Sequence, residues 1–276
     1  MKILITGANG YLGKGVVKQL LDDGHQVIAT DFKGDCIDKR ATTIIGNIFN
    51  IENPFTELCE PEVLLHMAWR DGFVHNSINH IIDLPNHVLF IRKMIESGIK
   101  RVAVLGSMHE VGFYEGSIDE NTPCNPDSLY GISKNALRNI VRLDCKKSGV
   151  KFQWLRGFYI VGNTTDGNSI FSKISQASRD GKTVFPFTTG LNQFDFLDYD
   201  VFCNYVAKTV EQDKINGIIN ICNGRPEKLA EKVEKFIKDN NFNIKLQYGS
   251  YPDRTYDSKA VWGNDDKIKK IMGYEK

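Results

Sequence analysis

The sequence has no excess of either charge. Lys and Arg total 35 against 34 for Asp and Glu, so the formal net charge is +1 over 276 residues. A protein that holds nucleic acid or an anionic membrane by electrostatic attraction needs a strongly basic surface. We therefore expect neither partner, and any recognition of phosphate has to be local.

Long apolar runs and an export signal are also absent. Apolar segments such as 63–65 and 102–105 have the length of strands and fall far below the ~20 residues that a membrane-spanning helix needs. Residues 1–5 lead directly into Thr6 and Gly7, which leaves no space for the charged and apolar regions of a signal peptide. These absences predict a cytoplasmic protein.

Paired cysteines are missing as well. None of the six cysteines belongs to a CxxC pair, and isolated thiols in a reducing compartment usually pack as small hydrophobic residues. We predict no disulfide and no metal site.

Short apolar runs alternate with helical patterns through the first 160 residues. Apolar residues recur at helical spacing in 12–21 and again in 78–95, where Pro85 predicts a kink or a break. The runs typical of buried strands are 2–6, 26–30, 43–45, 63–67, 101–105 and 152–156. This alternation predicts an α/β protein with a Rossmann-like, doubly wound parallel sheet.

The pattern changes after Gly162. Residues 163–168 are polar, and 183–190 mix aromatic residues with Thr and Gly in no clear period. We expect the sheet domain to occupy residues 1–162 and a smaller lobe to occupy 163–276. One strand at about 218–222 is expected to return to the sheet, followed by a helix at about 228–240.

Three glycines follow the first predicted strand and open the first helix. Gly7 permits a tight turn, Gly10 lets the backbone approach a pyrophosphate, and Gly13 lets the helix pack closely on the strand. The amino end of the helix then offers N–H groups to phosphate. The segment Gly7, Asn9, Gly10, Tyr11, Leu12 and Gly13 is therefore predicted to bind a dinucleotide, with residues 1–162 as the NAD(P)-binding domain.

An acidic residue ends the second strand, where the dinucleotide motif requires one. Asp31, followed by Phe32, can accept hydrogen bonds from an adenosine ribose and would repel a 2'-phosphate, so NAD(H) is favoured. Lys33 would soften that repulsion, so NADP(H) stays possible. The alternative is that Asp31 only caps a turn.

Tyr130 and Lys134 are four residues apart in a predicted helix and therefore share one face. A neighbouring cation lowers the pKa of a phenol, so we predict that Tyr130 exchanges a proton with a substrate oxygen. Ser107 follows the strand at 101–105, at the edge of a parallel sheet where ligands bind.

In this combination the sequence resembles the extended short-chain dehydrogenase/reductase family, the NAD-dependent epimerase/dehydratase group. The motifs that carry the resemblance are the glycine turn, Asp31, 66–68, Ser107, 120–126, 130–134, 155–156 and 254–257. The resemblance implies a nucleotide-sugar substrate for the smaller lobe. It also implies a homodimer formed through the helices at 78–95 and 130–143, and the alternative is that their apolar faces pack within the molecule.

By the same resemblance, three residues are catalytic. Tyr130 is the acid and base, Ser107 hydrogen-bonds the reacting oxygen, and Lys134 tunes Tyr130 and holds the nicotinamide ribose. Further cofactor contacts are implied at Asn47, Ile48, Ala68 and Trp69.

The residues after Ser107 distinguish subclasses of the family. Dehydratases follow the hydroxyl residue with an Asp-Glu pair, whereas here Met108 and His109 stand in those positions, and Met has no proton to give. Dehydration is therefore not expected, unless a shift of one residue brings Glu110 into the site. His109 is predicted to contact the substrate, and the alternative is a bond to a nearby backbone carbonyl.

The substrate side departs from the epimerases. Tyr159, which is predicted to contact the substrate, and Phe194 stand where epimerases usually carry Asn and Arg. Arg254 corresponds to the family's diphosphate-binding arginine, with a surface ion pair to Asp257 as its alternative. The segments 107–119 and 248–263 most resemble bacterial reductases of nucleotide-linked 4-keto-6-deoxyhexoses, including the type that forms dTDP-6-deoxy-L-talose.

We thus expect reduction of a C4 keto group by NAD(P)H. A 4-epimerase with tightly bound NAD is the alternative, and the Ser107, Tyr130 and Lys134 set argues against a dinucleotide-sensing regulator that does not turn over.

Overall fold

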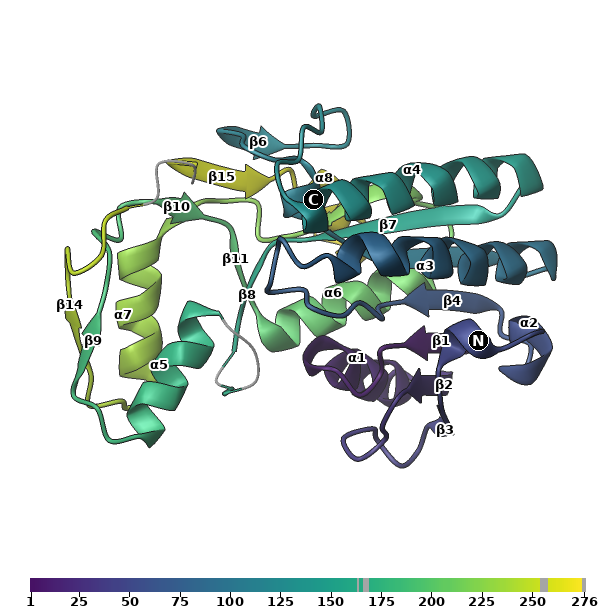
Figure 1. Ribbon diagram of the computed structural model, residues 1–276, viewed down its shortest axis with the longest axis horizontal. Helices are drawn as coiled ribbons and strands as arrows, with labels where there is room; N and C mark the ends of the chain where they lie inside the picture. Colours follow the sequence, from purple (N-terminus) through teal and green to yellow (C-terminus); the bar gives the residue numbers. More distant parts are fainter. Residues whose placement is uncertain (163, 166–168, 254–257, 275–276) are drawn as a thin grey trace.

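The computed structural model of the chain describes residues 1–162, 164–165, 169–253 and 258–274 (Figure 1). Its larger part is a seven-stranded sheet with helices on both faces, and its smaller part carries helices α5 and α7 beyond one edge of that sheet.

All seven strands of the main sheet are parallel. They are β1 (Lys2–Thr6), β2 (Gln26–Asp31), β3 (Thr42–Ile45), β4 (Val63–His66), β5 (Arg101–Ser107), β7 (Lys151–Gly157) and β12 (Gly217–Ile221). Their order in space is β12-β7-β5-β4-β1-β2-β3, so the direction of winding reverses between β1 and β4. In sheets of this kind ligands bind beside that reversal, outside the carboxyl ends of the strands. The predicted Rossmann-like fold is confirmed.

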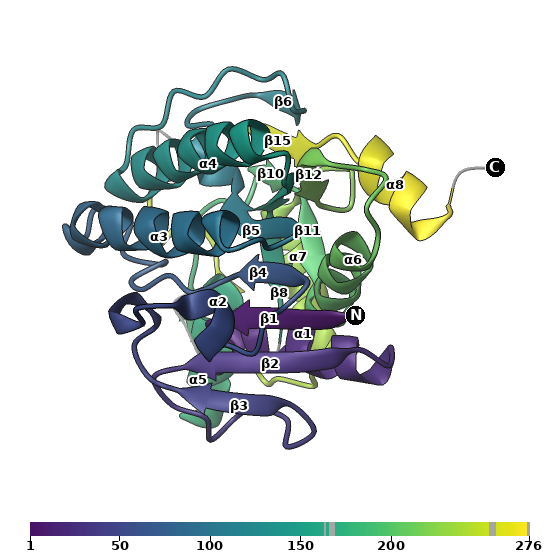
Figure 2. The same cartoon turned by 90° about the vertical axis from the view of Figure 1, so that its right-hand side faces the viewer.

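Two layers of helices cover the sheet (Figure 2). Helices α1 (Tyr11–Asp22), α6 (Tyr199–Glu211) and α8 (Asp266–Met272) lie on one face, and α2 (Pro54–Glu57), α3 (Asn79–Glu96) and α4 (Leu129–Ser148) on the other. Within β1, Ile3 and Ile5 pack toward α1 and α6, whereas Leu4 packs toward α3 and α4. Burial on both faces explains why the strands are continuous apolar runs. Among the described residues, no helix is long and apolar enough to cross a membrane.

Helix α3 departs from what its sequence predicted. Of the two alternatives at Pro85, the break is wrong: the helix continues through this residue, since the lost hydrogen bond is offset by packing against α4 and the sheet. The predicted apolar stripe also does not face inward as a whole. Ile91 and Ile95 are buried, whereas four other members are exposed, namely Ile78, Ile81, Ile82 and Leu89. Two histidines, His80 and His87, take inward positions on this helix, which an apolar pattern does not reveal.

The smaller part is assembled from segments that are distant in sequence. Its four-stranded sheet has the order β13 (Glu227–Lys228), β10 (Gln193–Phe194), β15 (Ala260–Gly263) and β6 (Gly116–Ile118). Helices α5 (Ile170–Arg179) and α7 (Leu229–Asp239) lie against it with the pair β9 (Val184–Pro186) and β14 (Lys245–Gln247), and β8 (Tyr159–Val161) pairs with β11 (Phe196–Asp198) between the two parts (Figure 1).

The chain crosses between the two parts several times. The strand predicted at about 218–222 is β12, which pairs in parallel with β7. Helices α6 and α8 also belong to the larger part, while β6 leaves it to pair with β15. The two parts therefore share segments from both halves of the chain.

Candidate active site

The turn between β1 and α1 is closed so tightly that only glycine fits. Gly7 has φ +71°, and a Cβ on it would lie 2.7 Å from the amide nitrogen of Ala68. A Cβ on Gly13 would lie 2.1 Å from the carbonyl oxygen of Gly7. The roles predicted for these glycines therefore agree with the geometry, and the backbone at the start of α1 forms a cradle that suits a dinucleotide pyrophosphate.

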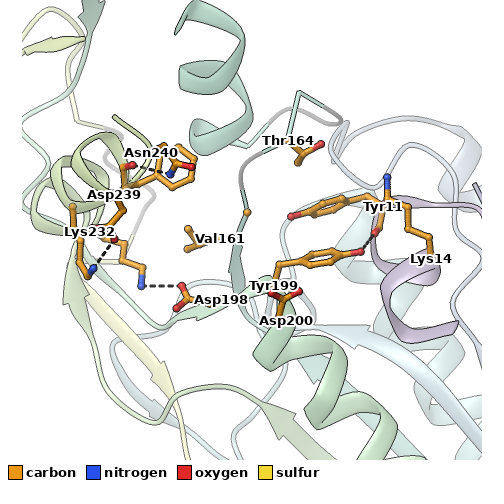
Figure 3. A pocket seen from close by; sticks show the side chains of 13 residues that line it. Tyr11, Lys14, Val161, Thr164, Asp198, Tyr199, Asp200, Lys232, Asp239 and Asn240 are labelled. Atoms are coloured by element: carbon orange, nitrogen blue, oxygen red, sulfur yellow. Dashed lines mark hydrogen bonds and ion pairs between the residues drawn. The ribbon is translucent and has the colours of Figure 1, made fainter. Parts of the chain in front are cut away.

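The side chain of Tyr11 turns away from this cradle. Its ring lies 4.7 Å from that of Tyr199, whose hydroxyl donates to the carbonyl oxygen of Tyr11 at 2.6 Å (Figure 3). Both rings line a cavity of about 510 Å³ between α1, α6 and α7, which the described side chains of the predicted catalytic set do not line. Leu12 likewise packs against the core. Only the backbone of these two residues is thus suited to a phosphate.

Asp31 lies beside the glycine turn at the end of β2. Its carboxylate accepts hydrogen bonds from the amide nitrogens of Asn9 at 3.0 Å and Phe32 at 2.7 Å. Asn9 in turn holds the following loop, because its side chain donates to Asp35 at 3.1 Å and accepts from the amide nitrogen of Cys36 at 2.7 Å. A carboxylate with two such donors still has lone pairs for a ribose diol.

The other residues predicted to contact the cofactor follow β3 and β4 at the same edge of the sheet. Asn47 accepts from the amide nitrogen of Phe49 at 3.1 Å, and Ile48 is buried. The amide nitrogen of Ala68 donates to the Thr6 hydroxyl at 3.2 Å. Trp69 stacks on His87 with 4.5 Å between the ring centroids. The residues 47–48 and 68–69 therefore line the edge beside β1.

The fold brings Ser107, Tyr130 and Lys134 together. Helix α4 starts at Ser128, whose hydroxyl accepts from the amide nitrogen of Gly131 at 3.2 Å, and the first turn then presents Tyr130 to Ser107 at the end of β5. The phenol of Tyr130 is hydrogen-bonded to the Ser107 side chain. The ammonium of Lys134 donates to the carbonyl oxygen of Leu105 at 2.9 Å and lies 4.0 Å from the ring centroid of Trp69.

Burial controls the proton affinity of this pair. It raises the pKa of Tyr130 to about 12, although the bond from Ser107 opposes the rise, and it lowers the pKa of Lys134 to about 7. The prediction that Lys134 would lower the pKa of Tyr130 was therefore wrong as a net effect. Burial removes water from both groups, which disfavours the charged phenolate and the charged ammonium alike. Tyr130 consequently holds its proton at neutral pH, as a proton donor must.

Aromatic rings surround Tyr130. His75 stacks on Tyr130 with centroids 5.3 Å apart, and His109 lies 4.4 Å from His75 and 6.2 Å from both Tyr130 and Tyr159. Tyr159 packs on Phe194 at 4.6 Å. The predicted substrate residue His109 is thus beside Tyr130, and Tyr159 is beside His109, whereas His75 belongs to no recognisable motif and was missed.

Comparison with known proteins identifies the family. The model of the NAD dependent epimerase/dehydratase family matches residues 3–222. The chain belongs to this family. It is therefore an NAD-dependent enzyme of the extended short-chain dehydrogenase/reductase type, and NAD(H), the cofactor that Asp31 favours, is confirmed.

Individual relatives agree with this assignment. A dTDP-6-deoxy-L-talose 4-dehydrogenase (NAD(+)) from Aggregatibacter actinomycetemcomitans is 41% identical over 95% of this chain and 99% of its own length. The fold is similar to a UDP-N-acetylglucosamine 4-epimerase from Methanobrevibacter ruminantium, with TM-score 0.86, 18% identity and coverage of 98% and 91% of the two chains. It is also similar to a dTDP-glucose 4,6-dehydratase from Streptomyces venezuelae, with TM-score 0.83, 19% identity and coverage of 100% and 92%.

A hydrogen-bonded chain of buried residues, Thr6, His66 and His87, supports the cofactor edge, the carboxyl end of the sheet that carries Ala68 and Trp69. This chain was not predicted. The Thr6 hydroxyl and His66 are 2.8 Å apart, and the other ring nitrogen of His66 is 2.8 Å from His87. Burial lowers the pKa of His66 to about 3 and that of His87 to about 2, so both rings are neutral at pH 7. His87 carries the stacked Trp69, so this chain fixes the wall beside Lys134.

Two further predicted residues have different outcomes. Arg254 lies outside the described residues, so its predicted phosphate contact stays a prediction. Glu110, the acid that a shift of one residue would bring into the site, is fully buried and bonded to Arg138, Trp154 and Arg156. It has no access to a substrate, so the position does not supply the additional acid of a dehydratase.

Proposed function

We propose that this enzyme reduces the C4 keto group of a nucleotide-linked 4-keto-6-deoxyhexose, carried on dTDP or UDP, with NADH. The observation that carries the proposal is the 41% identity to a dTDP-6-deoxy-L-talose 4-dehydrogenase along 99% of that protein. Such a dehydrogenase and a 4-ketoreductase catalyse the two directions of one reaction at C4.

The cradle at Gly7–Gly13, Asp31 and Lys134 would hold the dinucleotide, which when bound supplies the hydride to C4. Tyr130 gives the proton to the C4 oxygen, and its high proton affinity keeps that proton available at neutral pH. The Ser107 hydroxyl hydrogen-bonds the same oxygen and the phenol, which aligns the two. Tyr130 then regains a proton from solvent before the next cycle.

Two features favour this reaction over others in the family. Water elimination needs an additional acid and base. Glu110 is buried and hydrogen-bonded, and Met108 has no proton to exchange, so neither residue can take these roles. Phe194 packs on Tyr159, so the Arg and Asn with which epimerases of the family grip the nucleotide-sugar are replaced by an aromatic pair. We assign the diphosphate grip to Arg254 instead.

The second candidate is a 4-epimerase, because it would use the same Ser107, Tyr130 and Lys134. An epimerase retains its cofactor through both half-reactions and consumes none, whereas a reductase consumes one NADH for each product. A regulator without turnover has no need for this catalytic set.

The deciding experiment offers dTDP-, UDP- and GDP-linked 4-keto-6-deoxyhexoses with NADH. It follows the loss of absorbance at the reduced nicotinamide against product, which is separated by chromatography and assigned by NMR. Equal amounts of NADH lost and product formed are expected. Interconversion of 4-hydroxy epimers without NADH consumption would overturn the proposal in favour of the epimerase.

We further propose a homodimer formed through α3 and α4, which lie side by side on one face of the sheet (Figures 1 and 2). These helices expose a group of large apolar side chains, namely Ile81, Ile82, Leu89, Ile132 and Leu143. Such a patch is typical of a protein–protein contact. Leu89→Lys should shift the sedimentation coefficient from dimer to monomer, whereas the equally exposed Ile45→Lys on β3 should not.

A further inference from the structure

A fully buried ion cluster lies directly beneath the catalytic residues. Glu110 is 0% exposed, and three donors surround its carboxylate. These are Arg138 Nη1 at 3.1 Å, Arg156 Nε at 2.8 Å and Trp154 Nε1 at 2.7 Å. Two of these donors are guanidinium groups, so ion pairs compensate the burial of the carboxylate.

Each partner of Glu110 belongs to an element that carries or supports a catalytic residue. Glu110 follows Ser107 in the short helix η2 (Met108–Glu110) after β5. Arg138 is four residues beyond Lys134 and eight beyond Tyr130, so all three share one face of α4. Trp154 and Arg156 come from β7, and a Cβ on Gly106 would lie 2.1 Å from Trp154 Nε1, so the indole contacts the strand that presents Ser107.

The remaining bonds of the cluster are also made within the molecule. Arg156 donates to the carbonyl oxygen of Asp119 at 2.8 Å, and Arg138 donates to Asn135 at 2.6 Å and contacts the Cys124 sulfur at 3.3 Å. These bonds all lie within the protein, so we expect the cluster to act on the reaction through Ser107, Tyr130 and Lys134.

We propose that Glu110 is a positioning residue: its ion pairs with Arg138 and Arg156 hold η2 against α4 and β7, and its negative charge helps Tyr130 and Lys134 to keep their protons. This inference rests on the proposed function for the roles of Tyr130 and Lys134. The Glu110 carboxylate raises the pKa of Lys134, against the larger lowering by burial, and it also raises the pKa of Tyr130. Both effects have the same sign because a negative charge stabilises the protonated form of either group.

The other groups around the pair do not compete with this charge at neutral pH. His66 and His87, which face Lys134, and His109, which faces Tyr130, are neutral because burial lowers the pKa of each to about 4 or below. The charged neighbours are Glu110, Arg138 and Arg156, with the Asp119 carboxylate near Arg156. His75 and His80, whose rings both lie against Tyr130, are the same in every variant below.

Two substitutions change the charge of the cluster in opposite directions. Glu110→Gln leaves Arg138 and Arg156 without their counter-ion, so the proton affinities of Tyr130 and Lys134 should both fall. Arg138→Met removes one positive charge while Arg156 still holds Glu110, so both affinities should rise. Trp154→Phe removes one donor and no charge, and serves as the matched control for packing.

The expected signs follow from the direction of the reaction. Reduction needs Tyr130 and Lys134 protonated, so activity declines as pH rises through the lower of the two pKa values. We expect this alkaline limb of the kcat profile to move down by about half a pH unit or more in Glu110→Gln and up in Arg138→Met. In Trp154→Phe kcat should fall, with the limb unmoved.

A second measurement does not depend on turnover. ¹³C-lysine NMR titrates Lys134 directly, with its signal assigned by its loss in Lys134→Met, and should give shifts of the same signs. If the wild-type enzyme fails to consume NADH with the keto-sugars, the proposed function fails while this titration still decides the role of Glu110. Should Glu110→Gln not fold by circular dichroism, the upward shift in Arg138→Met carries the test. The inference is overturned if neither the alkaline limb of the kcat profile nor the titration of Lys134 shifts in Glu110→Gln and Arg138→Met. It is also overturned if the two variants shift in the same direction.

Discussion

The cofactor edge and the substrate side of this active site are built in different ways. The cofactor edge consists of backbone held in place by local contacts, such as the Gly7–Gly13 turn and the bond from the Asn9 amide to Asp31. The predicted substrate side consists of side chains from separate elements: the rings of His75, His109 and Tyr130 are in mutual contact, and Tyr159 contacts His109. The first kind of site tolerates little change in backbone, and the second depends on individual functional groups.

This difference predicts that substitutions on the substrate side change turnover and those at the cofactor edge change NADH affinity. The largest effect should come from Tyr130→Phe, which removes the proton donor but keeps the ring between His75 and Trp69. We expect kcat to fall at least ~100-fold with the Kd for NADH little changed. Steady-state kinetics and NADH fluorescence titration measure the two quantities, with Tyr159→Phe as the matched control. Near wild-type turnover in Tyr130→Phe would mean that another group donates the proton.

Gly13→Ala tests the cofactor edge. The new Cβ would meet the Gly7 carbonyl oxygen at 2.1 Å, so the turn must open. NADH should bind at least ~10-fold more weakly, and Tm should fall by calorimetry. The clash is with a backbone atom, so the backbone cannot move to relieve it without a cost in free energy. Gly72→Ala, where a Cβ meets nothing within 4 Å, is the control. Unchanged NADH affinity in Gly13→Ala would show that the turn is not the dinucleotide cradle.

Asp31→Asn separates cofactor choice from cofactor binding. It removes the charge that repels a 2'-phosphate and weakens the acceptor for the ribose diol. The ratio of kcat/KM for NADH over NADPH should drop by about 10-fold, the usual size of one charged hydrogen bond. If the ratio stays constant, Asp31 serves only to close the loop through Asn9 and Phe32.

The smallest effect is expected at His109, whose ring lies between His75 and Tyr159. Burial lowers its pKa to about 4, so the imidazole is neutral at pH 7, and we expect it to contact the sugar in that form. His109→Phe keeps the ring packing and should raise KM for the nucleotide-sugar about 3- to 10-fold without affecting NADH affinity. A change in the Kd for NADH instead would move His109 from the substrate side to the cofactor edge.

The parts of this protein that the sequence alone determined are those encoded by contiguous residues. The parallel strands, the glycine turn, Asp31 and the placement of Ser107, Tyr130 and Lys134 were all predicted, because each depends on local spacing and on the rule that carboxyl ends of parallel strands share one edge. The structure gives the same strands to within one or two residues.

Only the tertiary structure decided the state of the groups within that frame. Glu110 is kept from direct contact with a substrate by partners 28, 44 and 46 residues away, and His75 reaches Tyr130 from a loop without a motif. The outward face of α3 and the raised pKa of Tyr130 likewise follow from what packs against each group. Burial and charge come from neighbours that are distant along the chain, so these properties are fixed when the fold closes.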